Sequence, residues 1–362
     1  MDLTNLWCEI DLAAMAANID RIRKSTDKKI IAVVKCNAYG LGIEKITGFL
    51  DDKVDGFAVS DIDEALKVRS KKPVLILLPG IADEDIQKVK DNFILTIDNA
   101  ETLEKLKGKP YTVHILVNTG MNRFGAELKD VDELITMIED NYPNIAIDGI
   151  YTHLSHTGDS KYTMRQIESF RNTVRNHPYI RNVHVLNSAG FLKFNEADKG
   201  YGNCIRVGNL IYGSGADKYG YKKVYSYKAR LLSFYEVGKN QYIGYGNRYK
   251  TKKRTRVGIV NAGFVHGFSC SRNSGKGLLY SLALAFYRHF KKEELIFYKG
   301  KPVEIIGKCM NYTILNLDNI PADNKTVFDI ILSPILADAA IPKKYLNENH
   351  RAEWRESIRR VV

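Results

Sequence analysis

The sequence of 362 residues lacks any apolar run long enough to cross a membrane. A spanning helix needs about 20 consecutive apolar residues, so we expect no membrane partner. The first residues, MDLTNLW, also lack the basic and apolar segments of a secretion signal. The five cysteines are scattered and show neither a disulfide framework nor the spacing of metal ligands. These absences predict a cytoplasmic protein without a metal site.

An excess of basic residues is present, with 54 Lys and Arg against 42 Asp and Glu and a net charge of +12. Such a charge can attract the phosphates of nucleic acids. The basic residues come in short groups, such as residues 252–254, and no recognition motif accompanies them. We therefore expect a solvated basic surface and no specific nucleic-acid partner.

The first part of the chain alternates short apolar runs with amphipathic stretches. Eight runs predict strands, and the stretches between them predict helices. This alternation predicts an α/β fold, a (β/α)8 barrel of the TIM type, in which functional residues follow the strand ends. The predicted strands are residues 30–34, 56–60, 73–78, 93–97, 111–117, 145–151, 183–187 and 204–207, and the predicted helices include 11–24, 61–70, 82–91, 99–107, 131–140 and 162–176.

The pattern changes near residue 222, where apolar and polar residues alternate and glycine is frequent. Long strands are predicted over residues 227–238, 255–262 and 302–317. We expect a barrel of residues 10–221 and a β-rich C-terminal domain of residues 222–362, with residues 1–9 joining the latter. Residues 277–294 have the pattern of an amphipathic helix that closes a core or a subunit contact.

The stretch IIAVVKCNAYGLG, residues 30–42, places a lysine where a buried strand ends. Partial burial lowers the pKa of a lysine and makes its amine a usable nucleophile toward an aldehyde. A lysine that extends to solvent fits the same position. The residues that follow Lys35 decide between these interpretations.

VVKCNAYGLG closely resembles the signature of the alanine racemase family, which comprises pyridoxal 5'-phosphate (PLP) enzymes built from a barrel and a β domain. The resemblance implies that Lys35 holds PLP covalently and that Tyr39 helps to hold its phosphate. It also implies an isomerase that moves the Cα proton of a small-molecule amino acid and can form a D-amino acid. The family's shared active site further implies a homodimer.

Further motifs extend this resemblance. VHILVNTGMNRFG gives Arg123 the role of approaching the substrate carboxylate, and YTHLSHTGD places His153 near the cofactor ring. The alternative is that His153 is a buried histidine whose hydrogen bonds are satisfied within the protein and that takes no part in the chemistry. LNSAGF and IRVGNLIYG imply that the cofactor is also bound by Asn187, Ser188, Arg206, Gly208 and Asn209. An arginine that faces the pyridine nitrogen keeps it unprotonated and weakens the ring as an electron sink.

The sequence departs from the family where the second proton-transfer group is expected. Racemisation needs an acid–base group on each face of Cα, and the family uses the lysine and a tyrosine of the partner subunit. In GFVHG, residues 263–267, Phe264 stands at the tyrosine position and cannot donate a proton. His266 is the candidate replacement, with a surface turn residue as the alternative; Tyr280, Tyr287 and His289 are left open.

Two other positions also differ from the family. Leu116 stands where members often have a lysine that supports the arginine, and Asn311 stands where they usually have an aspartate. The resemblance still implies that the amide of Met310 contacts the substrate and that Tyr345 contacts the phosphate. These changes leave two alternatives open: a one-base PLP reaction at Cα, such as retro-aldol cleavage, and a PLP-binding protein without turnover.

Overall fold

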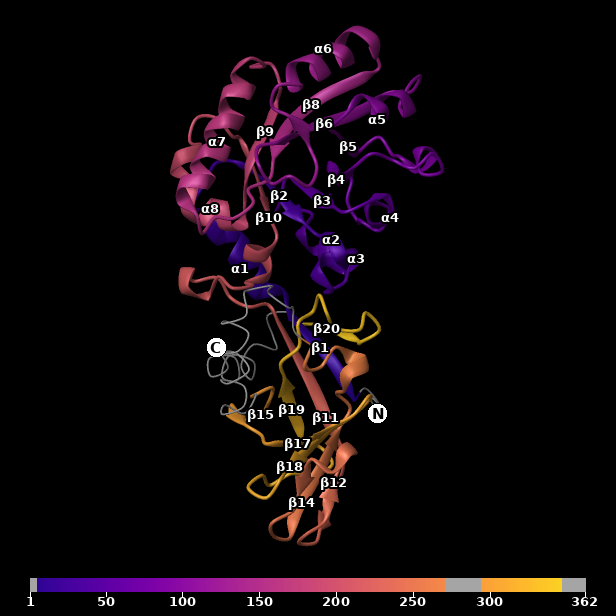
Figure 1. Ribbon diagram of the computed structural model, residues 1–362, viewed down its shortest axis with the longest axis vertical. Coiled ribbons are helices and arrows are strands. Elements are labelled where there is room, and N and C mark those ends of the chain that lie inside the picture. The colour runs from indigo at the N-terminus through magenta and orange to yellow at the C-terminus, as the bar shows by residue number, and fades with distance from the viewer. Residues whose placement is uncertain (1–4, 271–293, 347–362) are drawn as a thin grey trace. The chain divides into compact units, whose positions relative to one another are not determined.

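The computed structural model describes residues 5–270 and 294–346. The chain forms two compact units, one of residues 14–223 and one of residues 1–13 with 224–362 (Figure 1). All but the last residue of the predicted helix over 277–294 lies outside the described residues, and so do its candidates Tyr280, Tyr287 and His289. No described helix is long and apolar enough to span a membrane.

The first unit is a closed barrel of eight parallel strands. Strand β5 pairs with β6 and thereby closes the ring, which confirms the predicted barrel. A short strand, β7 (Ala126–Glu127), pairs with β6 outside this ring. The barrel strands are β2 (Lys29–Val33), β3 (Gly56–Val59), β4 (Val74–Pro79), β5 (Phe93–Ile97), β6 (Tyr111–Asn118), β8 (Ile145–Thr152), β9 (Asn182–Asn187) and β10 (Cys204–Val207).

Helices cover the outside of the barrel (Figure 1). Two predicted helices are wrong in extent. The one over 61–70 ends at Ala65, because none of residues 66–70 is buried. The one over 82–91 is reduced to a 3-10 turn, because none of its side chains is buried. The helices are α1 (Leu12–Arg23), α2 (Lys35–Tyr39), α3 (Ile43–Leu50), α4 (Ile62–Ala65), α5 (Ala100–Lys105), α6 (Val131–Asn141), α7 (Ser160–Arg175), α8 (Ser188–Phe194) and α9 (Asn209–Tyr212), with 3-10 turns η1 (Ile86–Lys88), η2 (Glu196–Asp198) and η3 (Asp217–Tyr219).

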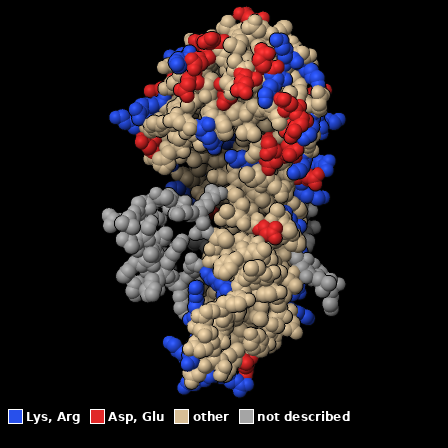
Figure 2. Space-filling model, turned by 45° about the vertical axis from the view of Figure 1, so that its right-hand side comes forward, with Lys and Arg blue, Asp and Glu red and all other residues tan. Residues whose placement is uncertain are grey.

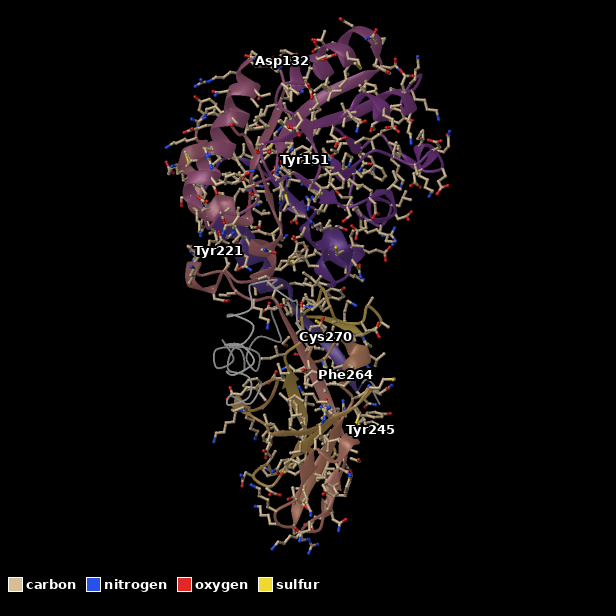
Figure 3. The ribbon with its side chains drawn as sticks, viewed as in Figure 1. Asp132, Tyr151, Tyr221, Tyr245, Phe264 and Cys270 are labelled. Carbon is tan, nitrogen blue, oxygen red and sulfur yellow. The ribbon has the colours of Figure 1, made fainter. Side chains whose placement is uncertain are left out.

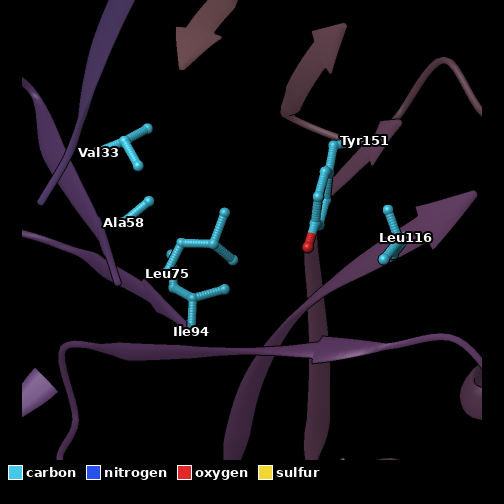
Figure 4. Packing of buried hydrophobic residues seen from close by; sticks show 6 residues of the cluster. All are labelled: Val33, Ala58, Leu75, Ile94, Leu116 and Tyr151. Carbon is cyan, nitrogen blue, oxygen red and sulfur yellow. The ribbon is translucent and has the colours of Figure 1, made fainter. Parts of the chain in front are cut away.

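A layer of apolar side chains fills the interior of the barrel (Figure 4). Six strands contribute one buried residue each, because alternate residues of a barrel strand point inward. Tyr151 adds a hydroxyl that lies 2.9 Å from Thr96 Oγ1, so its polar end is satisfied. The layer consists of Val33, Ala58, Leu75, Ile94, Leu116 and Tyr151.

The second unit is a β sheet arranged around the long strand β11 (Tyr225–Val237), which confirms the predicted β-rich domain. The predicted strand over 302–317 is instead a hairpin, because the chain turns at residues 309–312, where Cys309 N donates to Tyr312 O at 2.8 Å. The other described elements of the second unit are β1 (Leu6–Asp11), β12 (Tyr242–Ile243), η4 (Tyr245–Asn247), β13 (Tyr249–Lys250), β14 (Thr255–Val260), η5 (Phe264–His266), β15 (Ile296–Tyr298), β16 (Lys301–Pro302), β17 (Ile305–Lys308), β18 (Thr313–Asn316), β19 (Val327–Ile330) and β20 (Lys343–Leu346).

Charged side chains are distributed differently on the two units. On the face in Figure 2, acidic and basic side chains are interspersed over the barrel unit, whereas basic side chains gather at the lower end of the other unit. Exposed basic residues of the second unit include Lys239, Arg248, Lys250, Lys252, Lys253 and Arg254.

Candidate active site

A cavity of about 360 Å³ opens at the carboxyl ends of the barrel strands, where barrels of this type carry their active sites. Nine of the predicted site residues line it: Lys35, Tyr39, Arg123, His153, Asn187, Ser188, Arg206, Gly208 and Asn209. His266, Met310 and Tyr345 belong to the other unit and do not line this cavity. The barrel therefore brings nine of the twelve predicted site residues to one cavity.

Lys35 lies two residues beyond the end of β2, after Val34, and the chain then makes one left-handed turn, α2. Residues 36–39 have φ values between 53° and 55° although none is glycine, a conformation that costs about 1–2 kcal/mol per residue. The Glu64 carboxylate holds this turn by accepting the amides of Asn37 at 2.8 Å and Ser60 at 3.0 Å. Such strain is concentrated at functional sites, and here the turn gives Lys35 and Tyr39 access to the same cavity.

Tyr39 and Ser188 form a cradle of hydrogen-bond donors, and Gly208 lies beside both of them. Ser188 Oγ accepts the Gly208 amide at 3.0 Å, which leaves the hydroxyl hydrogen for another acceptor. Burial raises the pKa of Tyr39 to about 12, so its hydroxyl also keeps its proton. A Cβ at position 208 would lie 2.6 Å from the Tyr39 hydroxyl, so glycine keeps the cradle open. These donors fit a phosphate group.

Asn187 and Asn209 line the same end of the cavity. Asn187 caps α8, because its Oδ1 accepts the Gly190 amide at 2.9 Å and its Nδ2 donates to Leu154 O at 3.3 Å. The Asn187 side chain therefore holds its own loop. Direct contacts of either asparagine with a cofactor stay predictions.

Arg206 is the cation at the floor of the cavity and is only 3% exposed. It donates to His184 Nδ1 at 2.7 Å, to His184 O at 2.9 Å and to Thr152 O at 2.5 Å. Its guanidinium carbon lies 4.8 Å from the centre of the Tyr151 ring. Burial lowers the pKa of Arg206 to about 10, so it stays charged at neutral pH. Since none of these contacts is with a carboxylate, the floor presents a fixed positive charge.

Two buried histidines, His184 and His114, continue the hydrogen bonds that begin at Arg206. Neither was predicted from the sequence as part of the site. His184 Nε2 lies 2.9 Å from His114 Nδ1, and His114 Nε2 lies 3.2 Å from Asp148 Oδ2. Because Arg206 can only donate, His184 accepts at Nδ1 and donates to His114, which donates to Asp148. Burial lowers the pKa of both histidines and keeps them neutral. The sequence pattern that could have indicated them is a histidine within each of two apolar predicted strands, residues 111–117 and 183–187.

His153 also lines the cavity. Burial, followed by the charges of Arg206, Arg123 and Lys35, lowers the pKa of His153 to about 3. Its imidazole is therefore neutral at physiological pH. No described residue forms a hydrogen bond with its ring, so both ring nitrogens are available to a ligand.

Arg123 lies on the exposed loop after β6. Its guanidinium carbon is 5.7 Å from the centre of the Phe124 ring, and no described side chain forms an ion pair or hydrogen bond with it. Leu116 is packed in the apolar layer and cannot support it with charge. No Asp or Glu is among the described residues that line the cavity. The cavity thus fits an anionic cofactor together with a carboxylate.

In the other unit, η5 rests on the turn over residues 309–312. Phe264 N donates to Cys309 O at 3.3 Å, and Val265 N donates to Met310 O at 3.0 Å. His266 Nδ1 accepts the Gly263 amide at 3.1 Å, so residues 264–266 form a turn rather than a regular strand with Phe264 and His266 on one face. Phe264, which is labelled in Figure 3, is 52% exposed, and Met310 is 70% exposed. The predicted roles of His266 and Met310 toward a substrate stay predictions, and neither residue lines the barrel cavity.

Tyr345 lies on β20, opposite Ile10 of β1. Burial raises the pKa of Tyr345 to about 12, so its hydroxyl stays protonated. Its predicted contact with a cofactor phosphate stays a prediction.

A strand-end lysine beside a cradle for phosphate is the arrangement of barrel enzymes that bind PLP through a lysine. The chain belongs to the alanine racemase family: residues 10–215 match "Alanine racemase, N-terminal domain" and residues 224–334 match "Alanine racemase, C-terminal domain". This confirms the family, its PLP dependence and the isomerase class that the motifs implied. A one-base or non-catalytic alternative is not favoured.

Known relatives agree with this assignment. The alanine racemase of Aquifex pyrophilus is 30% identical over 316 residues, which are 84% of this chain and 82% of that protein. The alanine racemase of Streptococcus equi subsp. equi is 32% identical over 292 residues, 75% and 78% of the two chains. A solved alanine racemase of Clostridium difficile 630 has a TM-score of 0.82 at 21% identity and covers 96% of this chain and 97% of its own, which shows a shared fold.

Proposed function

We propose that this alanine racemase-family enzyme moves the Cα proton of a small amino acid inside the barrel cavity, with Lys35 as one of the proton-transferring groups. The supporting observation is that Lys35, Arg123 and Ser188 line one cavity without an acidic neighbour among its described lining residues. Bound PLP supplies the electron withdrawal that makes the Cα proton of an amino acid labile.

The residues of the cavity divide the binding between them. Arg123 binds the substrate carboxylate, because its guanidinium is charged and has no ion pair among the described residues. Tyr39 and Ser188 donate their hydroxyl hydrogens to the cofactor phosphate, with Gly208 leaving the necessary space. Arg206 would donate to the pyridine nitrogen of the bound cofactor and, as a fixed donor, would disfavour protonation there.

The second face of Cα requires another proton-transferring group, because Phe264 has none. His266 is the first candidate: its Nδ1 accepts from Gly263, so its proton is on Nε2 and can be donated. His153 is the second candidate, with free ring nitrogens inside the cavity.

We further propose that the enzyme is a cytoplasmic homodimer. Four exposed apolar side chains lie on the adjoining turns over residues 263–267 and 309–312, namely Phe264, Val265, Met310 and Tyr312. A second copy that covers this surface would remove it from water and bring His266 and the Met310 amide toward a neighbouring cavity. No described cysteine forms a disulfide, as is usual in reducing compartments.

The first experiment tests the cofactor lysine. Protein reconstituted with PLP should show the absorption band of lysine-bound PLP, and Lys35→Ala should abolish it. Lys45→Ala, an exposed lysine on α3, is the matched control and should keep the band. A colourless wild-type protein, or a band that persists in Lys35→Ala, would contradict the proposal.

The second experiment follows alanine and other small amino acids in heavy water by NMR and polarimetry. Exchange of the Cα proton with loss of optical rotation indicates transfer on both faces, and His266→Phe or His153→Phe should then suppress the loss of rotation and identify the second group. Exchange with retained configuration indicates that Lys35 acts alone. Absence of exchange for every amino acid would contradict proton transfer while leaving PLP binding intact.

A further inference from the structure

A buried glutamine on α7 connects the two loops that carry Arg123 and His153. Gln166 is 1% exposed, and both of its amide atoms are used. Its Oε1 accepts the backbone amide and the hydroxyl of Ser155, each at 3.1 Å. Its Nε2 donates to Thr119 Oγ1 at 3.2 Å and to His153 O at 3.5 Å. The orientation of the amide is fixed, because Ser155 N can only donate and His153 O can only accept.

The contacts of Gln166 continue to the floor of the cavity. Thr152 donates its hydroxyl to Val117 O at 2.8 Å, so the Thr119 hydroxyl, 2.8 Å away, donates to Thr152. The side-chain hydrogen bonds therefore run in one direction from Gln166 through Thr119 and Thr152 to Val117 O, and they strengthen one another in a buried setting. Arg206 binds the same residue separately, by donating to the backbone oxygen of Thr152.

A second contact from the same helix reaches the Arg123 loop. The Tyr162 hydroxyl donates to Gly120 O at 2.7 Å, and a Cβ at Gly120 would lie 2.3 Å from that hydroxyl. Gly120 has a φ of 121°, which favours glycine. Helix α7 thus holds the loop before Arg123 at two points, the Thr119 hydroxyl and the Gly120 carbonyl.

We propose that Gln166 is a positioning residue that sets the relative placement of Arg123 and His153 and thereby the affinity for the substrate carboxylate. Gln166 does not line the cavity, so it acts through the loops rather than on the ligand. The inference rests on the proposed function, because it assumes that Arg123 binds the carboxylate. A displacement of about 1 Å in such groups can lower activity on the order of 100-fold.

Gln166→Met tests this role, because it keeps the length of the side chain and removes all four hydrogen bonds. Ile167→Val is the matched control, since Ile167 is 1% exposed on the same helix and touches neither loop through a hydrogen bond. Thr119→Val is a milder second variant that breaks only the connection to the Arg123 loop.

Three readouts are measured on the PLP-loaded enzyme: the dissociation constant of propionate as a carboxylate probe, kcat and KM separately, and amide hydrogen exchange of residues 119–125 and 153–157. Gln166→Met should weaken propionate about 10-fold, raise KM more than it lowers kcat, and speed exchange in both loops. Thr119→Val should speed exchange in residues 119–125 alone.

Changes in Gln166→Met that match those of Ile167→Val, or a loss of stability with unchanged propionate affinity and loop exchange, would overturn the positioning role. If Gln166→Met does not fold, Thr119→Val decides by the same readouts. If the wild-type enzyme binds no propionate or PLP, the proposed function fails separately, and the hydrogen exchange of the two loops still tests the connection.

Discussion

The floor and the rim of the barrel cavity each carry an arginine, and the two are held in opposite ways. Arg206 at the floor is 3% exposed and donates three hydrogen bonds to His184 and Thr152. Arg123 at the rim is exposed and has no ion pair or hydrogen bond among the described residues. The floor is therefore fixed before a ligand binds, whereas the rim keeps a cation available for one.

This difference separates folding from binding. A change at the floor leaves buried acceptors without donors and should cost folding free energy. A change at the rim removes a group that solvent already contacts and should cost ligand affinity alone. The predictions below test this separation, from the largest effect to the smallest.

Arg206→Met should lower the free energy of unfolding by about 3 kcal/mol, because it leaves the carbonyls of His184 and Thr152 and the His184 ring without their donor. Urea unfolding measures this change. Arg175→Met is the control: Arg175 is exposed and donates to the Tyr201 hydroxyl at 2.9 Å, so its loss should cost less than about 1 kcal/mol. Equal effects of the two variants would contradict the fixed floor.

Arg123→Met should weaken binding of a carboxylate ligand such as propionate on the order of 10- to 100-fold, since a charge-assisted contact is lost. The free energy of unfolding should change by less than about 0.5 kcal/mol. Titration with propionate and urea unfolding on the same samples measure both. A large loss of stability with unchanged affinity would reverse the roles of rim and floor.

Sequence reasoning could predict the barrel because each of its strands is a short apolar run between amphipathic segments. It predicted the helix over 82–91 wrongly because charge and spacing do not reveal whether a face finds a packing partner. Motif resemblance predicted Lys35, Arg123 and Arg206, and all three line the cavity at or beyond the carboxyl ends of strands.

The remaining features of the site depend on long-range contacts. Gln166 sits within an amphipathic helix, where a polar residue is typical of a solvated face, and only the folded chain shows its burial. The directions of the hydrogen bonds through His184 and His114 follow from Arg206, 22 residues beyond His184. Gly40 and Gly42 indicated a tight turn after Lys35. The strained backbone nevertheless lies in the non-glycine residues 36–39 before them.

His153 lines the same cavity as the two arginines and titrates differently in the folded and the unfolded chain. The pKa of His153 is lowered to about 3 by burial and then by both arginines, whereas an unfolded histidine has a pKa of about 6.5. Between these values the unfolded chain binds a proton that the folded chain does not. The contribution of His153 to stability is therefore fully present above about pH 6.5. It is lost by up to about 1.4 kcal/mol per pH unit as the pH falls from about 6.5 to about 3.

His153→Gln should thus flatten the decline of unfolding free energy between pH 6.5 and pH 4, measured by urea unfolding of the cofactor-free protein at each pH. Burial lowers the pKa of His114 and His184 as well, so part of the decline should remain in the variant. Parallel profiles of wild type and His153→Gln would show that His153 is not held neutral by its surroundings.

A substitution in the left-handed turn α2, which follows β2 and ends at Tyr39 of the cradle, should give the smallest change in stability. Cys36 has a φ of 54° and is exposed, so a Cβ there is strained and buries little. Glycine removes that strain, about 1–2 kcal/mol, but adds freedom to the unfolded chain that costs about 0.5–1 kcal/mol. Cys36→Gly should therefore be more stable than the matched Cys36→Ala by about 0.5–1 kcal/mol in urea unfolding, since both variants lack the thiol and differ only in the Cβ. The opposite order would mean that the contacts of Glu64 and Asn37 impose no strain at this turn, and that the backbone after Lys35 is as relaxed as the rest of the barrel.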